Sequence, residues 1–528
     1  MFFSSRLKNR GSACIVRTVF LQNETVSENK DMTMKFTSTR SLQSLESSEV
    51  ITRGIAADGG LFVPESFPAL TKDFVEGLIP MTYKERAAEI LKFYLTDFTQ
   101  EEIARCVNGA YTNTFENNDP APLKALNGQL HILELWHGPT CAFKDMALQI
   151  LPYLLSVAAK KTAPGRTMVI LVATSGDTGK AALDGFADVE GTKIIVFFPQ
   201  DGVSAMQKLQ MTTQKGNNVA VCGIEGNFDD AQSGVKAIFA DEEMKKILSA
   251  KSFDFSSANS INFGRLLPQI VYYISAWCDL LKSGRISYGE KFNIAVPTGN
   301  FGNILAAYYA KQMGVPVGRF ICASNRNNVL SDFIRTGEYN RNRPFHTTTS
   351  PSMDILISSN LERLLYHLYN GETSKIAALM DSLKKDGVYK IDPAVLEKLQ
   401  ADFYGGFCDD EATARQIGKV FKEHSYLCDT HTAVALHVYE QYVKETGDDR
   451  PCVVASTASP FKFAPAVLSA VEDGAAFTGD EFEITERLSA VSGLAMPEAL
   501  SSLKNQEVLH KSSIDKKDMA QFILDFLK

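Results

Sequence analysis

The 528-residue sequence has no apolar run close to the length of a membrane span. Its longest runs, such as residues 168–173 and 194–198, have the length of a strand, whereas about 18 apolar residues are needed to cross a bilayer. Basic residues are not in excess either, because 54 lysines and arginines face 62 aspartates and glutamates, a net charge of −8. No stripe of basic and aromatic residues is present. These absences argue against a membrane or nucleic acid as partner, so we expect a soluble protein acting on a small molecule.

The nine cysteines are scattered, odd in number and without a Cys-x-x-Cys pair. Disulfide frameworks and zinc sites need cysteines at short, regular spacings, so we predict neither, and no metal site. The mature protein is therefore expected in a reducing, intracellular compartment. No repeat of 20–50 residues is present, which excludes a solenoid. With 45% hydrophobic and 22% charged residues, the chain has the composition of a globular protein with two or three domains.

The first 23 residues carry four basic side chains, several serines and no acidic residue. This composition resembles a mitochondrial or plastid transit peptide more than a secretory signal, which has a longer apolar segment. A disordered extension, or a true start at Met32 or Met34, is the alternative. We therefore predict an N-terminal extension over residues 1–33. The predicted location is the cytoplasm, or a mitochondrion or plastid if residues 1–33 are a transit peptide.

The remaining sequence alternates between two periodicities. Helical patterning through residues 83–94 and 101–111 predicts a mostly helical N-terminal domain over residues 34–125. Short apolar runs then alternate with amphipathic segments over residues 126–480, which predicts an α/β region of two subdomains with parallel sheets covered by helices. Residues 481–528 are predicted to form a C-terminal helical segment. In parallel sheets the loops after the strands form the binding site, so functional residues are expected there.

Two glycine-containing loops after predicted strands are suited to anions. Residues 297–303 read Pro-Thr-Gly-Asn-Phe-Gly-Asn and lead into a helix, so backbone N–H groups and the helix N-terminus suit a phosphate. Residues 174–179 read Thr-Ser-Gly-Asp-Thr-Gly and form a second such turn, suited to a carboxylate. Neither contains the Gly-Lys-Ser/Thr of a nucleotide-binding P-loop. Each turn alone is more often purely structural, so the prediction depends on their combination.

A third loop, residues 136–145, places Lys144 at the start of a predicted helix beside apolar residues. Such surroundings destabilise the proton of a lysine, which makes its amine nucleophilic. An isolated Phe-Lys-Asp is ordinarily a surface lysine. Together with two anion-binding turns, however, a reactive amine fits a cofactor that carries an aldehyde and a phosphate. That cofactor is pyridoxal 5'-phosphate.

Six motifs in a common order resemble the threonine synthase family, in the longer form found in fungi and many bacteria. The resemblance extends from about residue 35 to about residue 510. It implies a pyridoxal-phosphate enzyme of fold type II, related to the β subunit of tryptophan synthase. The implied reaction converts O-phospho-L-homoserine and water into L-threonine and phosphate, carried out by a monomer or homodimer. The motifs lie at residues 137–145, 175–179, 260–262, 297–303, 350–355 and 429–433.

The resemblance assigns roles residue by residue. Lys144 matches the lysine that forms a Schiff base with the cofactor and then acts as general base. Thr457 matches the hydroxyl that faces the pyridine nitrogen. The loop around the cofactor phosphate comprises Gly299, Asn300, Phe301, Gly302 and Asn303. The substrate-binding candidates are Ser175, Asp177, Thr178, Asn262, Arg265, Lys208 and Lys462. His137 and His431 are interpreted as turn and capping residues rather than catalytic ones.

Other functions stay open. A threonine-synthase-like phospholyase would release 2-oxobutyrate, ammonia and phosphate, and a serine/threonine ammonia-lyase would consume free threonine. A silent phosphate-binding protein would lack the lysine chemistry and would be colourless. Lys180, Cys141 and residues 325–328 depart from the family pattern, which leaves the predicted cofactor unchanged but bears on substrate detail.

Overall fold

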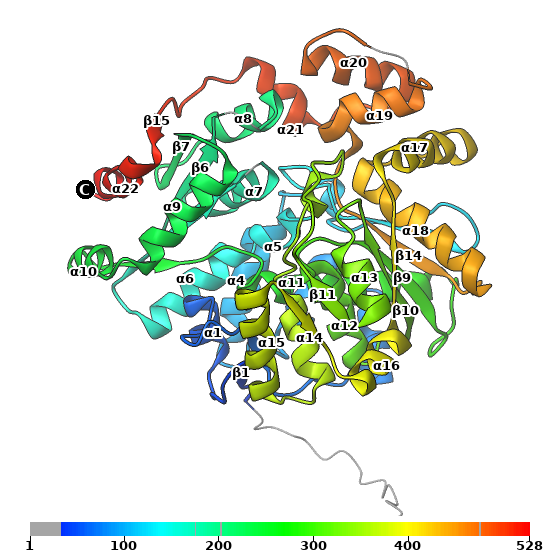
Figure 1. Cartoon of the computed structure of the whole chain (residues 1–528), viewed down its shortest axis with the longest axis horizontal. Helices are drawn as coiled ribbons and strands as arrows, with labels where there is room; N and C mark the ends of the chain where they lie inside the picture. Colours follow the sequence, from blue (N-terminus) through cyan, green and yellow to red (C-terminus); the bar gives the residue numbers. More distant parts are fainter. Residues whose placement is uncertain (1–32, 175, 201–202, 475–476) are drawn as a thin grey trace, which may run out of the picture. The chain divides into compact units, whose positions relative to one another are not determined.

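Two sheets with parallel strands organise the chain (Figure 1). The larger has the order β13-β10-β9-β14-β4-β3, in which β3 pairs antiparallel with β4 and the other neighbours are parallel. The second has the order β15-β7-β6-β5-β8 and is parallel throughout. The strands of the larger sheet are β3 (Leu123–Ala125), β4 (Leu130–Glu134), β9 (Phe292–Pro297), β10 (Val317–Ser324), β13 (Phe403–Phe407) and β14 (Cys452–Ser456). Those of the second are β5 (Thr167–Ala173), β6 (Thr192–Pro199), β7 (Val219–Glu225), β8 (Phe253–Ser256) and β15 (Ser513–Asp515).

This computed structural model describes residues 33–174, 176–200, 203–474 and 477–528, and residues 34–528 form one compact unit. The predicted extension falls almost wholly outside the described residues, so the transit-peptide hypothesis stays a prediction. None of the described helices is both long and apolar enough to span a bilayer. The two short antiparallel sheets pair β1 (Phe36–Ser38) with β2 (Phe62–Pro64) and β11 (Glu338–Asn340) with β12 (Val388–Lys390).

Helices cover both large sheets. For example, α9 packs on β5 and β6, and α18 packs on β9, β10 and β14. The helices before β9 are α1 (Ser47–Arg53), α2 (Lys72–Leu78), α3 (Tyr83–Leu91), α4 (Gln100–Tyr111), α5 (Asp145–Leu148), α6 (Leu151–Thr162), α7 (Asp177–Phe186), α8 (Ala205–Thr212), α9 (Phe228–Ala240), α10 (Glu242–Ala250) and α11 (Phe263–Lys282). Those after β9 are α12 (Gly302–Gln312), α13 (Val329–Thr336), α14 (Leu361–Leu368), α15 (Thr373–Asp386), α16 (Pro393–Asp402), α17 (Asp410–His424), α18 (Thr430–Thr446), α19 (Ala464–Val471), α20 (Glu481–Ser492), α21 (Glu498–Ser501) and α22 (Met519–Phe526).

Two stretches of continuous amphipathic patterning, residues 146–159 and 231–248, each form two helices in the structure. The helical pattern of residues 146–159 forms α5 and α6, and Pro152, which lacks a backbone N–H, lies in the first turn of α6 where none is required. The pattern of residues 231–248 forms α9 and α10, separated at Asp241. The Asp241 side chain accepts hydrogen bonds from the backbone N–H groups of Glu243 and Met244, which begins a new helix.

The C-terminal segment, predicted to be helical, also contributes a strand. Helices α20, α21 and α22 lie in it, but β15 pairs in parallel with β7 at the edge of the second sheet. A three-residue strand carries little periodicity of its own, and its pairing depends on the backbone groups that β7 leaves open. The C-terminal segment therefore extends the second sheet by one strand.

Candidate active site

The predicted functional loops follow strands of both large sheets. Lys144 follows β4 and directly precedes α5, while residues 298–301 join β9 to α12. Thr457 follows β14, the strand between β4 and β9. Asp177 is the first residue of α7, which follows β5 of the second sheet. Because functional loops leave the carboxyl ends of parallel strands, the fold brings these residues toward one another.

The Lys144 amine is buried beside a carboxylate and a hydroxyl. Its Nζ lies 3.7 Å from Asp177 Oδ2 and donates a hydrogen bond to Ser352 Oγ at 3.2 Å. Burial lowers the pKa of Lys144, against the opposing charge of Asp177. The positive charges of Lys462 and Arg265 lower this pKa further. A larger share of the amine is therefore unprotonated, as a nucleophile or general base requires.

Asp177 is held between two lysines. Its Oδ1 lies 2.7 Å from Lys462 Nζ and accepts a hydrogen bond from Gln207 Nε2 at 3.3 Å. Burial alone would raise the pKa of Asp177, but Lys462 and Lys144 outweigh it and hold the pKa below its usual range. Lys462 Nζ also donates to the Thr140 carbonyl at 2.8 Å. Lys462 is therefore a fixed cation whose charge acts on Lys144.

The loop after β9 approaches Lys144 through Ser352. A Cβ atom at Gly299 would lie 2.6 Å from the Ser352 carbonyl oxygen. The Ser352 hydroxyl in turn accepts the hydrogen bond from Lys144 Nζ. Ser358 Oγ donates to the Gly299 carbonyl at 2.7 Å, so Gly299 is in contact with Ser352 and hydrogen-bonded to Ser358. The structure thus brings the predicted reactive amine and the predicted phosphate loop into contact with one residue.

The end of this loop has a donor suited to a phosphate. Phe301 adopts the left-handed conformation with φ of 64°, from which the chain turns into α12. Asn303 Oδ1 accepts a hydrogen bond from the Tyr273 hydroxyl, whereas Asn303 Nδ2 is buried without a partner among the described residues. An unpartnered buried amide in the first turn of a helix fits an anion, because helix N-termini favour negative charge. These residues therefore fit the phosphate of the predicted cofactor.

Replacing Gly299 with alanine is expected to weaken cofactor binding. The new Cβ would collide with the Ser352 carbonyl at 2.6 Å and force the loop away from Lys144. We expect the dissociation constant for pyridoxal phosphate to rise by about tenfold or more, since a 1.4 kcal/mol loss corresponds to tenfold. Absorbance titration of the cofactor-free protein measures it. Gly77→Ala, where nothing lies within 4 Å, is the control, and equal affinities in the two variants would contradict the prediction.

The side-chain amide of Asn262 is used in hydrogen bonds within the protein, whereas Arg265 keeps an unused hydrogen-bond donor. Arg265 is buried, donates from Nη1 to the Ala258 carbonyl at 2.8 Å, and has an Nε without a partner among the described residues. Burial lowers the pKa of Arg265 to about 10, so it stays charged at neutral pH. Asn262 caps α11 and its amide donates to the carbonyls of Ile51 and Ser257. Asn262 thus positions Arg265 in the first turn of α11.

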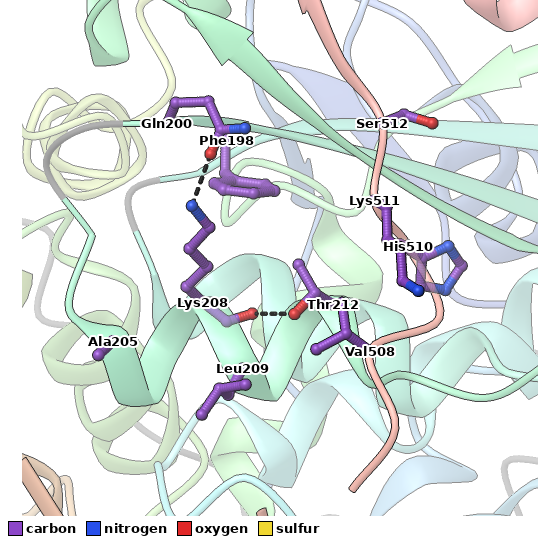
Figure 2. Close-up of a pocket in the computed structure, with 10 residues that line it drawn as sticks. All are labelled: Phe198, Gln200, Ala205, Lys208, Leu209, Thr212, Val508, His510, Lys511 and Ser512. Atoms are coloured by element: carbon purple, nitrogen blue, oxygen red, sulfur yellow. Dashed lines mark hydrogen bonds between the residues drawn. The ribbon is translucent and has the colours of Figure 1, made fainter.

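Lys208 lines a cavity whose lining includes none of these residues (Figure 2). Lys208 Nζ donates to Gln200 Oε1 at 2.7 Å, and the cavity, of about 360 Å³, lies between α8 and residues 508–512. The preceding residue, Gln207, contacts Asp177 from a different face of α8. Among the described residues Lys208 makes no hydrogen bond to the partners of Lys144, so we do not include Lys208 in the mechanism below.

The remaining predicted residues have simpler positions. Ser175 lies outside the described residues, and Thr178 is half-buried in the first turn of α7. Thr457 is buried, and its carbonyl accepts a hydrogen bond from the Phe143 backbone N–H at 2.8 Å, next to Lys144. Asn300 O accepts from the backbone and side-chain nitrogens of Asn360 at 3.0 and 2.9 Å.

Sequence reasoning assigned no role to Ser352 or Gln207, although both touch the central residues. Ser352 lies within the motif at residues 350–355, which was the available signal. His431, interpreted as a capping residue, is not itself the cap of α18. Asp429 is the cap, and the His431 ring instead contacts both Asp429 and Ser352.

His137, interpreted from the sequence as a turn residue, is bound by two carboxylates. Its Nδ1 lies 3.0 Å from Glu116 Oε2 and its Nε2 lies 2.8 Å from Glu134 Oε2. Burial alone would lower the pKa of His137, but the two glutamates outweigh it and raise the pKa to about 9. Both ring nitrogens of His137 therefore make charge-assisted hydrogen bonds, and the ring carries a proton on each nitrogen at neutral pH.

This arrangement predicts a pH-dependent contribution to stability. The folded pKa of His137 is about 9 against an ordinary value of 6.5, so its stabilisation is complete below pH 6.5 and lost as pH rises through 9. We expect His137→Asn to reduce the free energy of unfolding by about 2 kcal/mol at pH 6. The difference from wild type should shrink by pH 9.5. Urea unfolding at both pH values tests this, and a difference that does not change with pH would refute it.

Comparisons with known proteins agree with the geometry. Residues 35–111 match the family model "Threonine synthase N terminus", residues 115–457 match "Pyridoxal-phosphate dependent enzyme", and residues 432–514 match "Threonine synthase, C-terminal". The chain belongs to the threonine synthase family of pyridoxal-phosphate-dependent enzymes. The predicted family, its cofactor class and the α/β fold are therefore confirmed.

Individual relatives show how far this likeness extends. Threonine synthase of Pseudomonas aeruginosa is 37% identical over 465 residues, which cover 87% of this chain and 96% of that protein. Threonine synthase-like 1 of Homo sapiens is 42% identical over 435 residues, 80% of this chain but only 58% of that protein. The crystal structure of a PLP-bound threonine synthase from Brucella melitensis superimposes with a TM-score of 0.83 at 34% identity, covering 94% of this chain and all of that one.

Proposed function

We propose that this protein is a lyase that converts O-phospho-L-homoserine and water into L-threonine and phosphate. The observation that carries the proposal is the buried Lys144 amine beside two buried cations, Lys462 and Arg265, whose charges lower its pKa. A reactive amine beside fixed positive charge suits a substrate that loses a phosphate.

The domain boundaries are also a proposal: an N-terminal domain over residues 34–125, a catalytic region over residues 126–480 and a C-terminal segment over residues 481–528.

The chain's residues fit the cofactor at both ends. Pyridoxal phosphate, when bound, supplies an aldehyde that reacts with amines and a ring that withdraws electrons from the substrate. Lys144 would hold the aldehyde end, and Gly299, Asn300, Phe301, Gly302 and Asn303 the phosphate end. Thr457 would face the ring nitrogen. A neutral hydroxyl there, unlike a carboxylate, does not favour a proton on that nitrogen.

Lys144 is the proposed proton carrier. With its pKa lowered, Nζ can remove a proton from Cα of the substrate and then one from Cβ. Negative charge grows on the departing phosphate, and the buried Arg265, with its unpartnered Nε, would receive it. Lys462 adds fixed positive charge and is kept in place by Asp177. Once the phosphate has left Cγ, Lys144 delivers one of the two protons to Cγ, which becomes the methyl group. The hydroxyl of a water adds at Cβ while its proton goes to the released phosphate, and Lys144 returns the other proton to Cα.

The substrate carboxylate is assigned to the turn that begins α7. Thr178 is half-buried there, and Ser175 precedes it in the sequence. Helix N-termini favour carboxylates, and α7 has ten residues. Because Asp177 is already paired with Lys462, its proposed role is to orient this cation rather than to bind the substrate directly.

A phospholyase is the second candidate. The chain is 42% identical to threonine synthase-like 1, which is named apart from the threonine synthases, and 37% identical to a threonine synthase, so membership of the family does not decide which product leaves. Such an enzyme would release phosphate and let the product leave as 2-oxobutyrate and ammonia. The two reactions share the proton removals by Lys144 and the phosphate contact of Arg265. They differ only in whether water adds at Cβ.

Product analysis separates the candidates. The protein loaded with pyridoxal phosphate is incubated with O-phospho-L-homoserine, and phosphate, threonine, 2-oxobutyrate and ammonia are quantified. Threonine formed in equal amount to phosphate supports the proposal. 2-Oxobutyrate in equal amount to phosphate supports the second candidate, and no phosphate release contradicts both.

A further inference from the structure

The His431 ring is held between two partners that define its protonation. Its Nδ1 lies 2.8 Å from Asp429 Oδ1, and its Nε2 lies 3.1 Å from the backbone nitrogen of Ser352. A backbone N–H can only donate, so Nε2 must accept and carries no proton. The proton is therefore on Nδ1, where the Asp429 carboxylate accepts it. His431 is a neutral acceptor whose orientation is set by Asp429.

Asp429 and His431 are rigidly placed. Asp429 is fully buried and also accepts from the backbone N–H groups of His431 and Thr432 at the start of α18. His431 is 2% exposed, and the Phe463 ring packs edge-on against it at 4.8 Å. Because its carboxylate is fixed by the helix start, Asp429 leaves the imidazole little freedom to rotate.

Ser352, which donates its backbone N–H to His431, also contacts both Lys144 and Gly299. Ser352 lies in the short 3₁₀ helix η2 (Pro351–Met353), where its hydroxyl accepts from Lys144 Nζ and its carbonyl lies against Gly299. Ser350, two residues before Ser352, is held by Asn325, whose amide donates to Ser350 Oγ at 3.0 Å. The backbone N–H of Ser352 thus ties this turn to α18 through His431.

We propose that His431, oriented by Asp429, is a positioning residue that fixes Ser352 and thereby sets the direction of Lys144 Nζ toward the loop after β9. This role rests on the proposed chemistry of Lys144 but concerns a residue that neither binds substrate nor transfers a proton. Without His431, the Ser352 N–H loses its acceptor and η2 can shift, so Nζ loses a fixed partner.

Two substitutions separate positioning from simple stabilisation. His431→Leu keeps the bulk of the side chain but removes the acceptor for Ser352. His431→Gln restores one, since its carbonyl oxygen reaches about as far as Nε2. We expect kcat to fall about 10- to 100-fold in His431→Leu and to recover most of that loss in His431→Gln. His437→Leu, on the same helix, is the control.

The decisive readout does not need turnover. The absorbance spectrum of bound pyridoxal phosphate, recorded without substrate, is expected to change in His431→Leu and to match wild type in His431→Gln. Mass spectrometry after borohydride reduction gives the fraction of cofactor fixed to Lys144, which should fall in the leucine variant alone. Ser352→Ala, which removes only the hydroxyl, should reproduce the leucine result, and it covers the case in which His431→Leu does not fold.

The outcomes distinguish this inference from the proposed function. A wild-type protein that loads the cofactor on Lys144 but forms neither threonine nor 2-oxobutyrate contradicts the proposed function and leaves the spectral comparison intact. Unchanged spectra and reduction yields in both His431→Leu and Ser352→Ala overturn the positioning role. If wild type takes up no cofactor, reductive alkylation of Lys144 by a small aldehyde is compared instead, and equal labelling in all variants overturns the role.

Discussion

Lys144→Ala is expected to abolish turnover, with kcat reduced at least about 10³-fold. The substitution removes the only amine that the proposed mechanism uses for both cofactor attachment and proton transfer, and general base catalysis alone contributes about 10²- to 10⁴-fold. The fold should be retained, because Asp177 keeps its 2.7 Å ion pair with Lys462 after Lys144 is gone. Phosphate release from O-phospho-L-homoserine measures the loss.

Two observations accompany this result. Borohydride reduction should attach the cofactor covalently to wild type and leave no adduct on the alanine variant. Lys208→Ala is the matched control, because Lys208 is bonded to Gln200 and lines a separate cavity. Its turnover should stay within about twofold of wild type. A Lys144→Ala protein that forms product at the wild-type rate would disprove the proposed mechanism.

The contrast between Lys144 and Lys208 also shows what a sequence can predict. Lys144 was predicted from its place at a helix start beside apolar residues, and those local features survive folding because they belong to one loop. Lys208 was predicted only from its charge, because the departing phosphate of the implied reaction needs cations around it. Whether a helical residue faces inward depends on the rotation of the helix, and on α8 it is Gln207 that faces Asp177.

One strand of the larger sheet could not be recognised from its own residues for a similar reason. Residues 403–407 read Phe-Tyr-Gly-Gly-Phe, with two glycines, yet they form β13, which pairs with β10. Glycine is unfavourable in an isolated strand, but Gly405 allows Ser331 of α13 to approach, with the Ser331 Cα 3.0 Å from a Cβ built there. Tertiary packing therefore decides this strand, whereas the apolar runs of β5 and β6 could be identified from the sequence alone.

Charge pairing across the chain was not predictable from spacing. Asp177 and Lys462 were each predicted to bind substrate, and the structure pairs them with one another at 2.7 Å. Asp177 follows a strand of the second sheet and Lys462 follows a strand of the larger sheet, so no local sequence pattern links the two residues. The same holds for Ser352 and His431, since a hydrogen bond from a backbone N–H leaves no trace in residue type.

Arg265→Leu is expected to separate activity from stability. Arg265 is buried, no carboxylate within reach of a salt bridge accompanies it in the described part of the chain, and its Nε has no partner. Removing an uncompensated buried charge relieves its desolvation, which offsets the loss of its one hydrogen bond to the Ala258 carbonyl, so the melting temperature should stay level or rise. The variant should nevertheless lose about 10²- to 10³-fold in kcat/KM for O-phospho-L-homoserine, because the departing phosphate loses its counter-charge.

Arg363 provides the matched comparison. It is equally buried, and burial lowers its pKa to about 10 as well, but its guanidinium donates to the carbonyls of Phe62 and Ile261 at 2.8 and 2.6 Å. Arg363→Leu should therefore lower the melting temperature, since it leaves these buried acceptors unpaired. Thermal unfolding and kcat/KM are measured for both variants. If Arg265→Leu unfolds as readily as Arg363→Leu while keeping its activity, Arg265 is a structural residue, and the phosphate must be held elsewhere.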